Sequence, residues 1–150
     1  MPANADIAKY ANLPPEQAIR QAAKMVGVDE ETMVNFAKLE SSLKVNAKAN
    51  TTSASGLFQI VDGTWKELLG KHAKKYGIPM DADKNNPFYN ALMAAEYAKA
   101  NLSKLPDYKG TGLEESTALY MTHRFGTTGG INFIKQLLNN PNAPIENTIS

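Results

Sequence analysis

The chain has 150 residues, with 16 Lys+Arg, 15 Asp+Glu and no cysteine. Its length suits one domain with its own hydrophobic core, and a net charge of +1 argues against a dedicated nucleic-acid binder, which needs a surplus of cations. The absence of cysteine excludes disulfides and thiolate metal sites, and two histidines fit a dedicated zinc site poorly. We therefore expect a single domain over residues 1–150, with irregular tails at 1–13 and 140–150.

The sequence contains no stretch close to the roughly 20 apolar residues of a membrane span, so we expect no stable membrane insertion. The segment from Met1 to Tyr10 lacks the basic start and the apolar centre of a signal peptide. If the protein acts outside a cytoplasm, we expect that another component delivers it.

The first half of the chain predicts three helices with recognisable ends. The residues at these ends are Pro14, Pro15 and Gly27 for the first helix, Asp29 for the second, and Asp62 and Gly77 for the third. Proline favours a first helical turn, aspartate favours an N-cap, and glycine favours the position just after a helix. Between the second and third helices, residues 46–56 are rich in Asn, Thr and Ser and predict an irregular loop or a short β-hairpin.

The second half predicts three more helices. Asn86-Pro87 opens the fourth helix, which Pro106 closes, and a surface connection follows up to Gly112. A fifth helix is predicted from about Leu113 to Phe125, and a sixth from about Ile131 to Leu138. With about six helices joined by short loops, the fold class is predicted to be mostly α.

Glu40 stands out in this pattern, because it lies seven residues after Met33 and four after Phe36. On a helix, these spacings place its carboxyl group on the apolar stripe. Desolvation raises the pKa of a carboxyl group, and the C-terminal end of the helix dipole acts in the same direction. A general acid must keep its proton near neutral pH. The alternative is a frayed helix end at which Glu40 pairs with a lysine such as Lys44 and has no function.

The residues around Glu40 add a resemblance to a known family. Glu40-Ser41 is followed, after the polar loop, by Ser53-Ala54-Ser55-Gly56-Leu57-Phe58-Gln59-Ile60. These motifs resemble the lysozyme-like soluble lytic transglycosylases (SLT), in which Glu-Ser at a helix end precedes a Gly-Leu-(Met/Phe)-Gln segment. Two further segments, Gly63-Thr64-Trp65 and Asn90–Glu96, are similar to later motifs of that family in the same order. The likeness spans about Val28 to Leu138 and is closest to bacteriophage endolysins and virion-associated peptidoglycan hydrolases.

The resemblance implies a lysozyme-like helical domain, of the kind shared by goose-type lysozymes and SLT enzymes, that cleaves peptidoglycan. Glu40 would be the sole general acid and base at the β-1,4 bond between N-acetylmuramic acid and N-acetylglucosamine, leaving 1,6-anhydromuramic ends. No cofactor or metal is implied. The expected partner is the glycan strand, and we expect a monomer. The resemblance further implies a phage-encoded enzyme that acts on the bacterial cell wall in the periplasm or travels in the virion.

Further candidates for substrate binding are polar side chains, or glycine backbone, within these motifs. They are Ser41, Ser55, Gly56, Gln59, Glu96, Tyr120 and His123. The amide of Gln59 can bond to sugar hydroxyl or acetamido groups, and Gly56 lets a substrate approach the backbone. Ser41 either orients the neighbouring acid or caps the helix end. Glu96 stands at the edge of its helix stripe, where it either approaches Glu40 or is solvated.

The later helix departs from the family pattern. Many members have Ala-Tyr-Asn there, whereas this chain has Leu119-Tyr120-Met121-Thr122-His123, so the asparagine is lost. Tyr120 remains at the tyrosine position and shares a helix face with His123 through their i, i+3 spacing. A core tyrosine and a surface histidine are the alternative. The loss also leaves open a lysozyme-like module that binds glycan strands, or builds part of a virion, without cleaving them.

Asp62 leaves a second mechanism open. It lies 22 residues after Glu40, near the place where goose-type lysozymes have an aspartate that helps water to attack. If Asp62 had that role, the enzyme would be a hydrolase. The N-cap role already described is the structural alternative.

Overall fold

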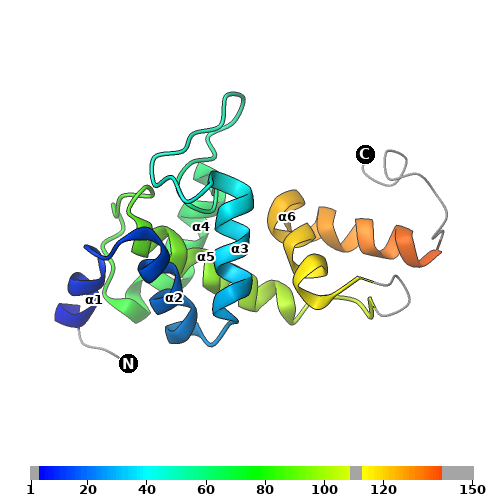
Figure 1. Ribbon diagram of the computed structural model, residues 1–150, viewed down its shortest axis with the longest axis horizontal. Coiled ribbons are helices and arrows are strands. Elements are labelled where there is room, and N and C mark those ends of the chain that lie inside the picture. Colours follow the sequence, from blue (N-terminus) through cyan, green and yellow to red (C-terminus); the bar gives the residue numbers. More distant parts are fainter. Residues whose placement is uncertain (1–3, 109–112, 140–150) are drawn as a thin grey trace. The chain divides into compact units, whose positions relative to one another are not determined.

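The computed structural model describes residues 4–108 and 113–139 of the chain, and these residues are mostly helical, as predicted (Figure 1). The helices are α1 (Asn4–Tyr10), α2 (Pro15–Val26), α3 (Glu30–Ser41), α4 (Asp62–Tyr76), α5 (Pro87–Leu102) and α6 (Glu115–Asn139). Contacts divide the chain into two compact units, Met1–Tyr97 and Ala98–Ser150. The boundary falls within α5, so this helix begins in the first unit and ends in the second.

Three of the predicted helix ends are confirmed, at Gly27, Asp29 and Gly77. Gly27 has φ 91° and its N–H donates to Ala23 at the end of α2. The side chain of Asp29 accepts a hydrogen bond of 2.9 Å from the N–H of Thr32 at the start of α3. Gly77 ends α4 with φ 70°. Because these contacts satisfy backbone groups that a helix end leaves unpaired, they fix where each helix begins and ends.

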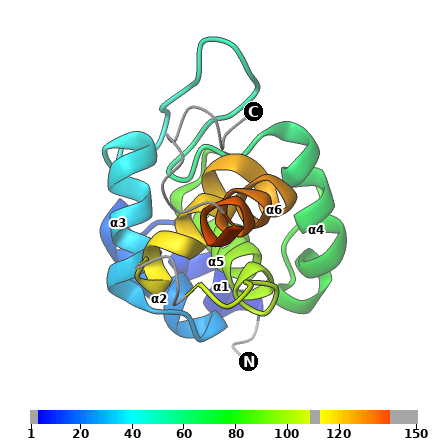
Figure 2. The ribbon, with the colours of Figure 1, turned by 90° about the vertical axis from the view of Figure 1, so that its right-hand side faces the viewer.

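Helix α5 is the central element of the first unit. All residues from 90 to 96 are buried, which is typical of a helix enclosed on every side. In the first unit, α3 lies on one side of α5 and α4 on the other (Figures 1 and 2). The side chain of Asn86 accepts hydrogen bonds from the N–H groups of Phe88 and Tyr89, at 3.0 and 3.1 Å, and so caps the first turn.

The predicted irregular tail at 1–13 is wrong in part, because residues 4–10 form α1. The helix is held by tertiary contacts: Ile7 is buried, and the ring of Tyr10 packs on Phe88 with centroids 5.3 Å apart. Such contacts override a weak local signal in a short segment. The other predicted tail, 140–150, lies outside the described residues.

The two helices predicted at 113–125 and 131–138 are confirmed as two helical segments that meet at the non-helical residue Gly126 within α6, although the second begins earlier than predicted. Gly126 has φ 80° and ψ 161°, a conformation that essentially only glycine adopts. The break brings Gly130 close to Thr122, so a Cβ on Gly130 would lie 2.5 Å from the Thr122 backbone. The second unit has its own core, in which Ala118, Phe133 and Ile134 are buried.

The segment between α3 and α4 contains no strand and so differs from the hairpin that the sequence left open. It has two isolated antiparallel bridges, which pair Ser55 with Lys48 and with Ile60.

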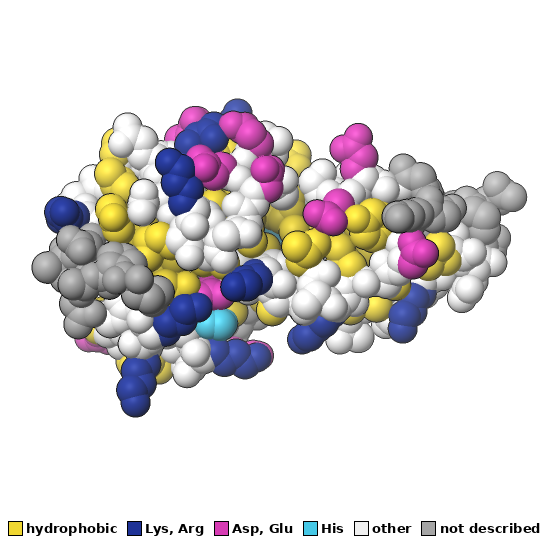
Figure 3. Space-filling model, turned by 90° about the horizontal axis from the view of Figure 1, so that it is seen from below, with side chains coloured by type: hydrophobic (Ala, Val, Ile, Leu, Met, Phe, Trp, Pro, Cys, Tyr) yellow, Lys and Arg dark blue, Asp and Glu magenta, His cyan; other side chains and the backbone are white. Residues whose placement is uncertain are grey.

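Within the described residues, no helix combines the length and the apolar composition that crossing a bilayer requires. On the face shown in Figure 3, Lys and Arg side chains are interspersed with acidic, neutral and apolar ones.

Candidate functional site

Glu40 is the next-to-last residue of α3 and is half-buried. Directly after the helix, Ser42 and Leu43 adopt φ values of 54° and 63°, which are uncommon for residues other than glycine. Ser41 is buried, and its hydroxyl donates to the carbonyl of Ala37 at 3.0 Å. Of the two roles predicted for Ser41, this contact matches the one at the helix end. The backbone therefore leaves the helix, directly after Glu40 and Ser41, through two strained residues.

A chain of hydrogen bonds leads from this helix end to Gln59. The N–H of Lys44 donates to Ser41, and the N–H of Ala47 donates to Lys44, at 3.1 and 3.2 Å. The Ala47 carbonyl then accepts 2.9 Å hydrogen bonds from the side chain of Gln59 and from the N–H of Gly56. The structure thus connects the end of the predicted catalytic helix to the segment that carries Ser55, Gly56 and Gln59.

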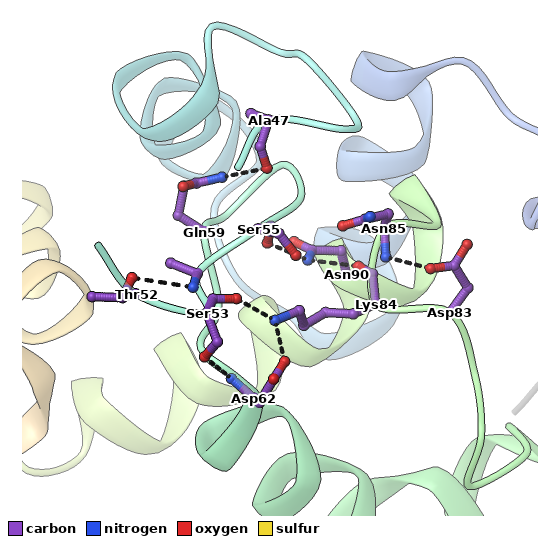
Figure 4. A network of polar contacts seen from close by, with 11 residues as sticks. Ala47, Thr52, Ser53, Ser55, Gln59, Asp62, Asp83, Lys84, Asn85 and Asn90 are labelled. Carbon is purple, nitrogen blue, oxygen red and sulfur yellow. Dashed lines mark hydrogen bonds and ion pairs between the residues drawn. The ribbon is translucent and has the colours of Figure 1, made fainter. Parts of the chain in front are cut away.

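Gln59 is itself in a strained conformation, with φ 51°. Its amide nitrogen donates to the carbonyl of Ala47 at 2.9 Å (Figure 4). The same nitrogen donates to the carbonyl of Gly56 at 3.0 Å. Since an amide has two N–H donors, both are used within the loop. What Gln59 has left to offer a ligand is the carbonyl oxygen of its side chain, which accepts hydrogen bonds.

Gly56 is held against α5. Its φ is 83°, and a Cβ on it would overlap the side-chain amide of Asn90 and lie 3.1 Å from the carbonyl of Lys84. The glycine is thus required by packing on these two residues. Ser55 is buried and contributes its backbone to both bridges of the loop.

Sequence reasoning missed two residues that hold this loop in place, Lys84 and Asn90. Asn90 is fully buried; its oxygen accepts from the N–H of Phe58 at 2.9 Å, and its nitrogen donates to the carbonyls of Lys84 and Ser55. Lys84 donates 2.7 Å hydrogen bonds to the Ser53 carbonyl and to Asp62. Two signals for Asn90 were available, its place at the start of the motif-like segment Asn90–Glu96 and its polar side chain in an apolar helix. The sequence contains no signal for Lys84.

Asp62 does not cap α4, contrary to the N-cap prediction. The N-cap residue is Val61, and Asp62 is the first helical residue. Its N–H donates to the hydroxyl of Ser53 at 2.8 Å, and its carboxylate pairs with Lys84. A charged donor holds a carboxylate more strongly than backbone N–H groups do, which explains why the carboxylate of Asp62 pairs with Lys84 and does not cap the helix. The hydrogen bond from Lys84 lowers the pKa of Asp62 below its usual value.

Glu96 is buried against α4. Its carboxylate accepts hydrogen bonds from the hydroxyl of Tyr76 at 2.5 Å and from Lys75 at 3.1 Å, and His72 lies 3.8 Å away. Burial alone would raise the pKa of Glu96, but the bonds from Tyr76 and Lys75 outweigh it and hold the pKa below the usual value. These contacts join α4 to α5, so Glu96 is placed in a helix–helix contact within the core.

Tyr120 and His123 belong to the second compact unit, on α6. Both are half-buried, and their rings stack with centroids 6.4 Å apart and planes inclined by 23°. The i, i+3 spacing therefore does bring them together on one helix face. Their role in binding substrate stays a prediction. No group of three or more His, Asp or Glu side chains in the described parts of the chain could hold a metal ion.

The described residues thus form a mostly helical structure in which Glu40 lies at the end of α3 and hydrogen bonds connect that helix end to the loop that carries Gln59. A family model described as Transglycosylase SLT domain matches residues 17–142. The match covers well over half of the 150 residues, from α2 to beyond the end of α6. The chain belongs to the transglycosylase SLT domain family.

Proposed function

We propose that the protein is a peptidoglycan lytic transglycosylase in which Glu40 is the sole general acid and base. The observation that carries the proposal is the position of Glu40. It is a half-buried residue at the end of α3, within the part of the chain that the SLT family model matches. The hydrogen-bonded path from that helix end to Gln59 supports it, because a catalytic acid and a substrate-binding group need a fixed separation.

The proposed reaction has two proton transfers on one carboxyl group. Protonated Glu40 gives its proton to the oxygen between N-acetylmuramic acid and N-acetylglucosamine, and the bond from that oxygen to C1 breaks. The 2-acetamido group of the substrate stabilises the positive centre at C1, as in substrate-assisted glycosidases. The C6 hydroxyl of the muramic acid then bonds to C1 while the Glu40 carboxylate takes its proton. The product is a 1,6-anhydro sugar, and the enzyme regains its starting state without consuming water.

The environment of Asp62 supports this route over the hydrolytic one. A general base that activates water needs a free carboxylate with adequate basicity. The carboxylate of Asp62 is instead bonded to Lys84 at 2.7 Å, and this contact lowers its pKa. We therefore expect Asp62→Asn to give the same type of product as the wild type.

Product analysis distinguishes these mechanisms. Purified peptidoglycan is digested, and the muropeptides are measured by mass spectrometry before and after borohydride reduction. A transglycosylase gives muropeptides that are one water lighter than reducing-end muropeptides and do not react with borohydride. Reducing ends alone would replace the proposal with a lysozyme-type hydrolase, and Asp62→Asn would then be expected to lose activity.

Glu40→Gln tests the role assigned to the acid. The variant keeps the size and polarity of the side chain but has no proton to donate, so we expect turnover to fall by at least about a hundredfold. Glu67→Gln, which makes the same substitution at an exposed glutamate of α4, is the matched control. If Glu40→Gln and the wild type degrade peptidoglycan equally, or if neither does, the protein binds glycan strands or has a structural role instead.

A further inference from the structure

Lys84, in the segment between α4 and α5, has an unusual environment for a lysine. Its side chain is only 13% exposed, and its ammonium group donates to the Ser53 carbonyl and to the carboxylate of Asp62, each at 2.7 Å. Removing an ammonium group from water is costly unless partners replace the lost hydration. Lys84 obtains these partners from two separate segments, the loop after α3 and the start of α4 (Figure 4).

The backbone of Lys84 is fixed by the same residue that holds the other end of the loop. Asn90 donates to the Lys84 carbonyl at 2.9 Å and accepts from the N–H of Phe58 at 2.9 Å. Since Asn90 lies in the buried part of α5, it is a rigid point of attachment. Segment 53–59 is thus attached near its start by Lys84 and near its end by Asn90.

The start of this segment depends on such an attachment, because Ser53 is exposed whereas Leu57 and Phe58 are fully buried. The backbone also has positive φ values at Gly56 and at Gln59. A strained backbone persists only where surrounding contacts over-determine it. If the contact of Lys84 with Ser53 were lost, we therefore expect the start of the segment to relax and the strained backbone up to Gln59 to be held less firmly.

We propose that Lys84 is a positioning residue. Its hydrogen bonds to Ser53 and Asp62 hold segment 53–59, and with it Gln59, in the conformation that the reaction requires. The inference rests on the proposed function for its catalytic part. If Lys84 served stability alone, its substitution would lower the thermal midpoint and leave kcat of the folded protein unchanged. Because Asp62 is 66% exposed, the ion pair itself contributes little to the stability of the fold.

The test compares Lys84→Met with Lys71→Met. Lys71 also forms an ion pair of 2.9 Å, with Glu67, but both side chains are exposed and the pair lies within a single helix, α4. Amide hydrogen exchange is measured for residues 53–62 and for α2, and the thermal midpoint is recorded. We expect exchange in 53–62 to become at least about tenfold faster in Lys84→Met, with α2 unchanged and Lys71→Met equal to the wild type.

Turnover of a soluble glycan-strand substrate provides the second measurement. We expect kcat for Lys84→Met to fall about 10- to 100-fold, by more than KM rises, because misplaced groups reduce catalysis. Lys84→Arg should recover most of the loss, since a guanidinium can donate to a carbonyl and a carboxylate together. Lys84→Gln is measured in parallel, so that an unfolded methionine variant does not prevent the comparison.

The outcomes separate the two proposals. Unchanged exchange in segment 53–62 overturns the inference, and so does faster exchange with unchanged kcat. Equal activity of wild type and Glu40→Gln overturns the proposed function and the catalytic part of the inference together. The exchange data would then show whether Lys84 still anchors the loop for a structural purpose.

Discussion

Gly56 is the residue whose identity the structure constrains most directly. Its φ of 83° strains any L side chain, and a Cβ would overlap the amide of Asn90, which is fully buried and cannot move aside. We predict that Gly56→Ala lowers the free energy of unfolding by about 1–3 kcal/mol. It should also reduce turnover, because the loop that carries Gln59 must shift. Urea unfolding and product formation from peptidoglycan measure the two effects.

Gly70→Ala is the matched control for this prediction. Gly70 lies in the interior of α4, and a Cβ there would meet no atom within 4 Å. In an exposed helix interior, alanine is more favourable than glycine. We therefore expect Gly70→Ala to increase the free energy of unfolding by about 0.5–1 kcal/mol and to leave turnover unchanged. If the two substitutions shifted the urea midpoint in the same direction, the close approach of Gly56 to Asn90 would not explain the effect.

At the level of the elements, α6 depends on a close contact across its break. A Cβ on Gly130 would lie 2.5 Å from the backbone of Thr122, and backbone atoms cannot yield as a flexible side chain can. We predict that Gly130→Ala lowers the free energy of unfolding by about 1–3 kcal/mol and speeds amide exchange in α6. Gly129→Ala is the comparison, because its Cβ would meet only the Phe125 side chain, at 3.3 Å. A larger cost at Gly129 would contradict this account.

The predictability of the helices follows from where their determinants lie. The caps at Gly27, Asp29 and Gly77 could be predicted because each one acts on backbone groups within a few residues of itself. The helix α1 could not, since it depends on the packing of Tyr10 against Phe88, far along the chain. The two helices on either side of Gly126 were predicted correctly, but the sequence did not indicate that only one residue would separate them.

At the level of the whole molecule, the same distinction applies to the candidate site. Glu40 and Gln59 could be found from local patterns and from the family motifs. Lys84 could not, because its partners are Ser53 and Asp62, which are 31 and 22 residues away. Glu96 has partners 20 and 21 residues away, in α4. Its position on the helix stripe was visible in the sequence, but the donors that face it were not.

The contacts of Glu96 lead to a prediction for the stability of the whole protein against acid. Hydrogen bonds from Tyr76 and Lys75 hold its pKa below the usual 4.5, so the folded protein favours the ionised form. The resulting stabilisation is fully present above about pH 4.5, the usual value for a glutamate, and is lost as the pH falls through the lowered pKa. His72 also reduces the stability of the folded protein in acid. Burial lowers the pKa of His72, so this loss of stability begins as the pH falls below about 6.5, the usual pKa of a histidine.

Glu96→Gln isolates the carboxylate from these other effects. Near pH 7 we expect the variant to be less stable than the wild type by about 1–2 kcal/mol, since a buried charge-assisted contact is replaced by a neutral one. Because acid neutralises the wild-type carboxylate, the difference should shrink as the pH falls below about 4. Against the effect of burial, Glu96 raises the pKa of His72, which lies 3.8 Å away, so both proteins are compared in a His72→Gln background. Urea unfolding at pH 7, 5 and 3 measures the difference. A gap that stayed constant or widened towards pH 3 would mean that Glu96 is not ionised in this contact between α4 and α5.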